Sequence, residues 1–147
     1  MSSPIFLISN EWRPFYLSWD TNSSSLAMVG ECTSLSEIWI LENMREHWRI
    51  QNAALGIEKS LTANQLGKRI HLDMLPTDKS EGDRQLWLSE GSQGGTSGNR
   101  IYNAEYGSET VLTIVGDSKD PPSALGVELR TLDEKSLLQM WTIRNPQ

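Results

Sequence analysis

Two short motifs each recur three times in this chain, always in the same order. The first motif is Ile-x-Asn, found at Ile8-Ser9-Asn10, Ile50-Gln51-Asn52 and Ile101-Tyr102-Asn103. The second is Gln-x-Trp or its Glu variant, found at Glu37-Ile38-Trp39, Gln85-Leu86-Trp87 and Gln139-Met140-Trp141. Motifs that repeat in register along 147 residues indicate tandem copies of one supersecondary unit. The copies cover about residues 1–45, 46–97 and 98–147.

Alternating segments precede the tryptophan of each copy, at Leu26–Val29, Arg69–Leu72 and Gly126–Leu129. Alternation at period two with apolar residues is typical of β-strands, and the apolar run Thr110–Val115 adds a buried strand. A helix over Ser36–Ile50 is the main alternative, but the apolar residues there do not keep helical spacing. We therefore predict four strands in each copy.

A unit of four strands cannot bury its apolar face alone, so three copies are expected to close around a shared core. The sequence thus predicts a single all-β domain over residues 1–147, a β-trefoil with pseudo-threefold symmetry. Trp39, Trp87 and Trp141 are in register and are predicted to lie in the core, as are Phe6 and Trp48 at the start of their copies.

The charge of the chain excludes several kinds of partner. Thirteen Lys and Arg against nineteen Asp and Glu give a net charge of -6, and no basic run is present. This charge argues against nucleic acid and anionic membranes as binding partners.

No apolar segment is long enough for a signal peptide or a membrane span, so we expect a cytoplasmic protein. Cys32 is the only cysteine, which excludes an intrachain disulfide, and we predict that it is a small buried thiol.

The sequence assembles no recognisable catalytic or metal centre. His47 and His71 are the only histidines, and they lie in different copies. The glycine-rich stretch Gly91–Gly98 lacks the Gly-Lys-Ser/Thr of a phosphate-binding loop. We therefore predict a protein that is not an enzyme and that binds no metal or cofactor.

At the repeated motifs the chain resembles the ricin-B-like, or R-type, β-trefoil family, especially its small mushroom lectins. Gln-x-Trp is a mark of that family, and an aromatic-x-Ile-x-Asn opening strand is another. Phe6–Asn10 and Trp48–Asn52 fit this opening, whereas the third copy has Asn99 at the aromatic position. The resemblance implies a fungal, non-catalytic, carbohydrate-binding lectin whose partners are glycans or glycoproteins. Such proteins usually gain avidity by dimerising or by using several sites, and a homodimer is the expected route here.

A sugar site needs an aromatic face for stacking and a carboxylate or amide for the hydroxyl groups. At the aromatic position of the family this chain has Gly30, Asp73 and Arg130, and none of the three can stack. The first copy is the best remaining candidate, since some mushroom lectins have a glycine and a polar residue there. The predicted carbohydrate-binding residues are Trp19, Asp20, Asn22, Gly30 and Glu31.

Two other functions fit the same fold. Mushroom protease inhibitors also use a β-trefoil, and an inhibitor of trypsin-like enzymes would need a projecting basic residue. The candidates for that residue are Arg13, Arg45, Arg130 and Lys135, while an inhibitor of cysteine proteases would need none. A trefoil that only mediates protein interactions is the third possibility.

Overall fold

The computed structural model describes residues 5–77, 79–90, 98–117 and 119–145. Within these ranges the chain forms twelve strands and four short 3-10 helices. The strands are β1 (Ile5–Asn10), β2 (Tyr16–Asp20), β3 (Ser25–Val29), β4 (Trp39–Met44), β5 (His47–Asn52), β6 (Lys59–Leu66), β7 (Arg69–Pro76), β8 (Trp87–Glu90), β9 (Arg100–Asn103), β10 (Thr110–Val115), β11 (Gly126–Thr131) and β12 (Trp141–Arg144). The helices are η1 (Leu35–Glu37), η2 (Lys79–Gln85), η3 (Pro122–Ala124) and η4 (Leu137–Gln139).

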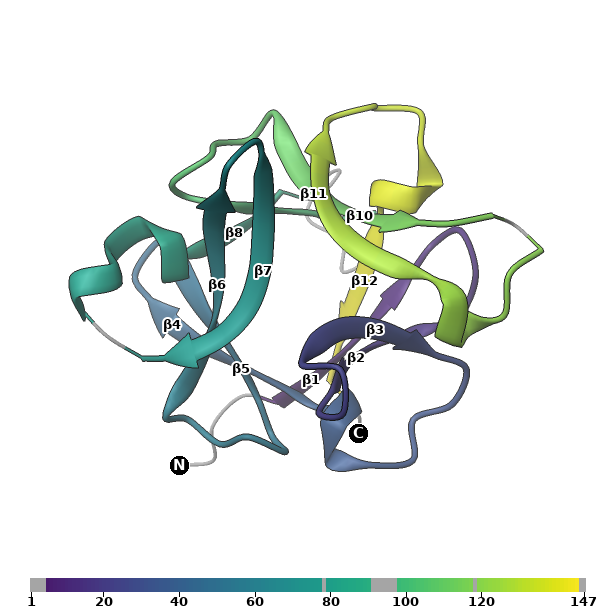
Figure 1. Ribbon diagram of the computed structural model, residues 1–147, viewed down its shortest axis with the longest axis horizontal. Helices are drawn as coiled ribbons and strands as arrows, with labels where there is room; N and C mark the ends of the chain where they lie inside the picture. Colours follow the sequence, from purple (N-terminus) through teal and green to yellow (C-terminus); the bar gives the residue numbers. More distant parts are fainter. Residues whose placement is uncertain (1–4, 78, 91–97, 118, 146–147) are drawn as a thin grey trace.

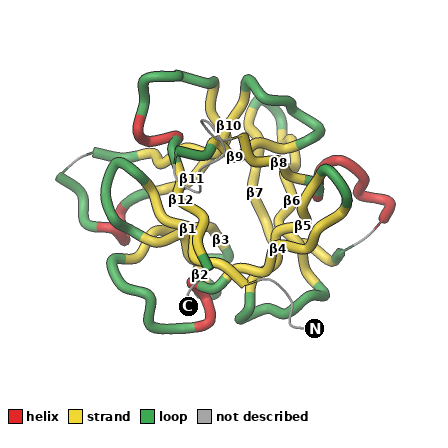
Figure 2. Tube along the Cα trace, turned by 180° about the vertical axis from the view of Figure 1, so that it is seen from behind, coloured by secondary structure: helices red, strands yellow, loops and turns green. Residues whose placement is uncertain are grey.

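Six strands form a closed barrel, and three hairpins cover one of its ends. Antiparallel pairing joins β4 to β5, β5 to β8 and β8 to β9, while β1 pairs with both β4 and β12. The bridge between Asn99 and Trp141 closes the ring. The hairpins β2–β3, β6–β7 and β10–β11 lie over the barrel, with β3, β7 and β11 around the centre of Figure 1. Figure 2 shows the ring from behind, with the short helices on its outside.

The three repeated tryptophans occupy equivalent places in the core. Trp39, Trp87 and Trp141 are 0%, 1% and 0% exposed, which confirms the prediction that they are core residues. Each indole Nε1 donates a hydrogen bond to the backbone carbonyl of a leucine in the second strand of its own unit, at 2.9–3.0 Å; the acceptors are Leu17, Leu61 and Leu112. The indole therefore fills the core without leaving its polar atom unpaired.

The asparagine of each Ile-x-Asn motif joins two neighbouring units. The Nδ2 atoms of Asn10, Asn52 and Asn103 donate to the carbonyls of Leu138, Ser36 and Arg84. Each acceptor is the residue directly before the Gln or Glu of a Gln-x-Trp motif. Each asparagine Oδ1 also accepts from a backbone N–H two residues further on. The two motifs recur together because they bind one another across every unit boundary.

The first residue of Gln-x-Trp is buried in all three units, although its chemistry differs. Gln85 donates from Nε2 to Thr62 Oγ1 at 3.0 Å and to the Pro76 carbonyl at 2.9 Å. Glu37 instead accepts, from Ser18 Oγ at 2.8 Å and from the backbone N–H of Thr33 and Ser34. Glutamate is tolerated at this position because these donors satisfy its carboxylate.

The segment from Ser36 to Ile50 comprises the end of η1, then β4, a turn and the start of β5, which confirms the prediction of strands over an α-helix there.

One expectation about the core needs correction. Phe6 and Trp48 were predicted to be buried, but they are only partly buried and lie at the end of the barrel away from the hairpins. The barrel therefore ends in a partly open aromatic layer.

Replacing Trp87 by alanine should lower the free energy of unfolding by about 3–5 kcal/mol, because it empties a core position and orphans the Leu61 carbonyl. Urea denaturation measures this change. Leu66→Ala, at an exposed position, is the control and should change stability by at most about 0.5 kcal/mol. Equal effects of the two substitutions would contradict the core assignment.

Replacing Asn10 by alanine should cost about 1–3 kcal/mol, because it removes the contact between the first and third units and leaves the Leu138 carbonyl and Trp12 N–H unpaired. The same urea titration applies. Asn22→Ala, which changes an exposed turn residue, should leave the unfolding midpoint almost unchanged. A loss below about 0.5 kcal/mol in Asn10→Ala would argue against the closing role of this bond.

Candidate functional site

The five predicted carbohydrate-binding residues lie on one hairpin but at opposite ends of it. Asp20 pairs with Ser25 next to the β2–β3 turn, which contains Asn22. Gly30 and Glu31 follow β3 at the other end, beside the pair Tyr16–Val29. Four residue steps of strand place the two ends about 13 Å apart. The structure therefore does not bring all five residues around one sugar ring.

Trp19 cannot serve as the predicted stacking surface. Its side chain is 5% exposed and belongs to the hydrophobic core, where it lies opposite Leu26 of β3. A buried indole offers no free face to a sugar, so the assignment of Trp19 to the binding surface was wrong. The Asp20 carboxylate and the Asn22 amide, at the hairpin turn, remain accessible.

The hairpin turn holds Asp20 as a fixed, charged acceptor. Its Oδ1 accepts a hydrogen bond from the backbone N–H of Asn22 at 2.9 Å. Hydrogen bonds from the Ser23 side chain and from the Asn22 backbone lower the pKa of Asp20 below its usual value. Asp20 is therefore ionised at neutral pH and can accept hydrogen bonds from sugar hydroxyl groups.

Asp20 lies at the edge of a cleft between the three hairpins that has both polar and apolar walls, and we call it the axial cleft. Its volume is about 520 Å³, and its walls come from β3, from the start of β7 and from the η3–β11 segment. In Figure 1 these three strands surround the centre of the view. The polar side chains that line the cleft are Asp20, Ser23, Ser25, Arg69, His71, Ser123 and Glu128. Asn22 is not among the lining residues.

The charged groups of the axial cleft are of both signs. Arg69 Nη2 lies 3.7 Å from Glu128 Oε1, and Arg130 Nη2 lies 3.3 Å from Glu128 Oε2. The Arg69 side chain is 82% exposed, so its ion pair is weak and its N–H groups can turn to a ligand at small cost. The cleft thus offers carboxylate acceptors and a guanidinium donor within one concave surface.

The opposite end of the first hairpin is built differently. Gly30 lies against Pro122, whose Cγ would be 3.7 Å from a Cβ at position 30. The nearby β1–β2 loop carries Arg13, whose guanidinium stacks on the rings of Phe15 at 4.2 Å and Trp12 at 5.6 Å. Arg13 therefore occupies one face of each ring, which leaves less aromatic surface for stacking on a sugar.

The basic residues proposed for a trypsin-like inhibitor are not presented as substrate mimics. Arg13 also donates to the carbonyl of Asp120 at 2.8 Å and is held against the protein. Arg45 occupies the tight β4–β5 turn with a positive φ of 76°, whereas a substrate-like loop is extended. Arg130 lies within β11 and pairs with Glu128. Lys135 lies in a turn in which its own N–H donates to Asp133 Oδ1.

No group of three or more His, Cys, Asp or Glu side chains in the described part of the chain is arranged to hold a metal ion. None of the helices in residues 5–77, 79–90, 98–117 and 119–145 has the length and apolar character needed to cross a membrane.

Known proteins resemble this chain in structure but not detectably in sequence. No protein-family model matches it, and no curated protein matches it either. A ricin B-like lectin from Macrolepiota procera, determined in complex with lactose, has a TM-score of 0.76 at 17% identity over 99% of both chains. The designed threefold-symmetric protein ThreeFoil has a TM-score of 0.76 at 13% identity, over 96% of this chain and 98% of its own. The chain has the β-trefoil fold.

A third β-trefoil neighbour is larger. The Polyporus squamosus lectin, bound to the epitope Neu5Acα2-6Galβ1-4GlcNAc, has a TM-score of 0.74 at 16% identity. The similarity covers 99% of this chain and 50% of that lectin. At these identities the likeness establishes the shared fold, and the binding properties of the neighbours remain their own.

The residues that line the axial cleft come from three different units, and the sequence alone does not show that they form one site. Arg69 and His71 come from the second unit and Glu128 from the third, and no motif marks any of them. Only the threefold arrangement of β3, β7 and β11 brings them to Asp20. The equivalence of these strands was visible in the sequence, but the identity of the cleft side chains was not.

Cys32 is exposed, which contradicts the prediction of a buried thiol. Although Cys32 is exposed, neighbouring atoms partly desolvate its thiol. This desolvation, followed by the negative charge of Glu37, raises the pKa of the thiol above its ordinary value.

Because Cys32 is exposed, the native protein should react fully with a thiol reagent, and the pH midpoint of that reaction should be higher than in the urea-unfolded chain. Rates of iodoacetamide alkylation from pH 7 to pH 11 measure both midpoints. Protection of the native thiol, or a lower native midpoint, would contradict this description.

Proposed function

We propose that this protein is a non-catalytic lectin whose glycan ligand lies in the axial cleft. The observation that carries the proposal is the combination, in one concave surface of about 520 Å³, of the Asp20 and Glu128 carboxylates with the Arg69 guanidinium. Sugar hydroxyl groups both donate and accept hydrogen bonds, so they match a surface that offers both kinds of partner. The volume lies within the usual range for small-ligand sites.

The lining of the cleft also indicates how a glycan would be held. Among the described residues no Trp, Tyr or Phe lines it, and its apolar surface comes from aliphatic residues such as Leu26, Ile70 and Val127. Binding would therefore depend on charge-assisted hydrogen bonds more than on stacking against an aromatic ring. This favours a short, hydroxyl-rich oligosaccharide as the ligand.

The structural neighbours support this proposal at the level of fold. The Macrolepiota procera lectin was determined with lactose, and the Polyporus squamosus lectin with a sialylated trisaccharide. A single cleft on the axis gives each chain one site, and a single sugar site binds weakly. We therefore propose that the protein forms a homodimer, which would provide avidity on glycoproteins.

A glycan array with the labelled native protein is the first experiment. Binding to a set of glycans that share one sugar would support the lectin and name its ligand. A blank array, repeated with multivalent presentation, would contradict the lectin. The protein would then be tested on a panel of cysteine and serine proteases, because stoichiometric inhibition is the signature of the inhibitor alternative.

The position of the site can be tested with isosteric variants on the best array ligand. Asp20→Asn and Glu128→Gln should each weaken binding by about tenfold or more, because each replaces a charged acceptor with a neutral amide. Glu134→Gln, at an exposed residue outside the cleft, is the control and should bind normally. Calorimetric titration measures all three affinities.

Glu31→Gln distinguishes the two ends of the first hairpin. If the glycan lies in the axial cleft, this variant should bind as the native protein does. Loss of binding in Glu31→Gln, together with normal binding in Asp20→Asn, would place the site beside Gly30 and contradict the axial assignment.

A further inference from the structure

The end of the barrel opposite the hairpins departs from threefold symmetry. Phe6, Trp48 and Asn99 occupy equivalent positions, each two residues before the isoleucine of an Ile-x-Asn motif. Two of the three units thus place an aromatic ring at this end of the barrel, and the third unit places a small amide there. The third unit therefore supplies less side-chain volume to this end of the barrel than the other two units do.

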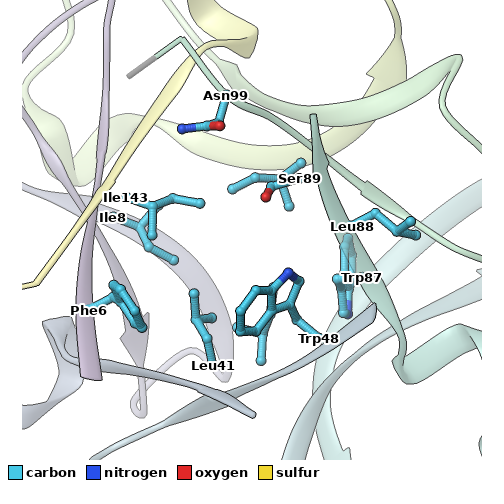
Figure 3. A pocket seen from close by; sticks show the side chains of 11 residues that line it. Phe6, Ile8, Leu41, Trp48, Trp87, Leu88, Ser89, Asn99 and Ile143 are labelled. Atoms are coloured by element: carbon cyan, nitrogen blue, oxygen red, sulfur yellow. The ribbon is translucent and has the colours of Figure 1, made fainter. Parts of the chain in front are cut away.

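A cavity of about 230 Å³ lies at this position, and all six barrel strands contribute to its lining. Its walls are mainly apolar, and Figure 3 shows Leu41 and Ile143 among the side chains around its open centre. The isoleucines of the three Ile-x-Asn motifs also line it. Apolar cavities of about 150 Å³ in proteins stay dry and accept benzene. The cavity therefore has room for one ring and a small substituent.

One edge of the cavity is polar. Ser89 and Asn99 lie along it, and the indole nitrogen of Trp48 faces the same open space in Figure 3. Among the described residues none accepts a hydrogen bond from Trp48 Nε1, in contrast to the paired indoles of Trp39, Trp87 and Trp141. An N–H donor that faces an apolar cavity can pair with a ligand that brings an acceptor oxygen.

We propose that this cavity binds a small aromatic molecule of one ring that carries an oxygen substituent. The ring would take the volume that an aromatic side chain at position 99 would fill, and its oxygen would accept from Trp48 Nε1. The cavity and the axial cleft lie at opposite ends of the barrel and share no residue. The proposal therefore does not depend on the lectin function.

Calorimetric titration of the native protein with phenol and with benzene tests the cavity. Both compounds should bind, and phenol should bind more tightly by about threefold to tenfold because it can accept from the indole N–H. Adding phenol should also shift the NMR signal of the Trp48 indole proton. Absence of binding by both compounds up to their solubility limits would overturn the proposal.

Variants that fill the cavity locate the binding. Asn99→Phe supplies the missing ring and should weaken both ligands by at least about tenfold. Ile143→Phe fills the same space from another wall of the cavity. It replaces Asn99→Phe in the experiment if thermal melting shows that Asn99→Phe does not fold. Leu137→Phe adds a ring at an exposed position that does not line the cavity, and it should bind as the native protein does. Unchanged binding in a folded cavity-filling variant would overturn the proposal.

Trp48→Phe separates the roles of shape and hydrogen bonding. This variant keeps an aromatic ring but removes the donor, so phenol should lose its preference over benzene. A preference that stays the same would exclude Trp48 as the donor. Glycan binding should be unchanged in all of these variants, so failure here and failure of the lectin proposal can be told apart.

Discussion

The structure depends on one interaction that is made three times, the hydrogen bond from an Ile-x-Asn amide to the carbonyl before a Gln-x-Trp motif. Each unit is too small to bury its own apolar face, so its stability comes from contact with its neighbours. The asparagine is almost fully buried. Its Nδ2 donates across the unit boundary, and its Oδ1 accepts from a backbone N–H of its own unit. The bond from Asn10 to Leu138 extends the pattern to the two ends of the chain and closes the ring.

The fold could be predicted because this interaction and the indole hydrogen bonds require particular residues at fixed places. Leu17, Leu61 and Leu112 accept the indole bonds, and they align the second strands of the three units. With that alignment Trp19 is equivalent to Ala63 and Ile114, and all three are buried. Tryptophan stands at this position only in the first unit, so the repeated tryptophans do not mark it as a core position. Strand alternation does not mark it either, because Leu17, Ser18 and Trp19 are all buried in β2.

The candidate binding surface was predicted only in part, for a topological reason. Asp20 is one of the predicted site residues and lines the axial cleft, whereas no sequence motif singles out Arg69, His71 or Glu128, which come from distant strands. Their proximity is a product of the threefold closure, which brings the third strand of each unit to one axis. At the opposite end of the barrel the sequence shows that Asn99 breaks an aromatic pattern, but the cavity at that position was not predicted.

The most direct test of the account is a nitrogen–proton NMR titration of the native protein with the glycan that the array selects. If the axial cleft is the site, the shifted amide signals will cluster at the β2–β3 turn, at the start of β7 and in β11, with Asp20, His71 and Glu128 among them. Shifts confined to the β1–β2 loop and to Gly30 and Glu31 would contradict the account.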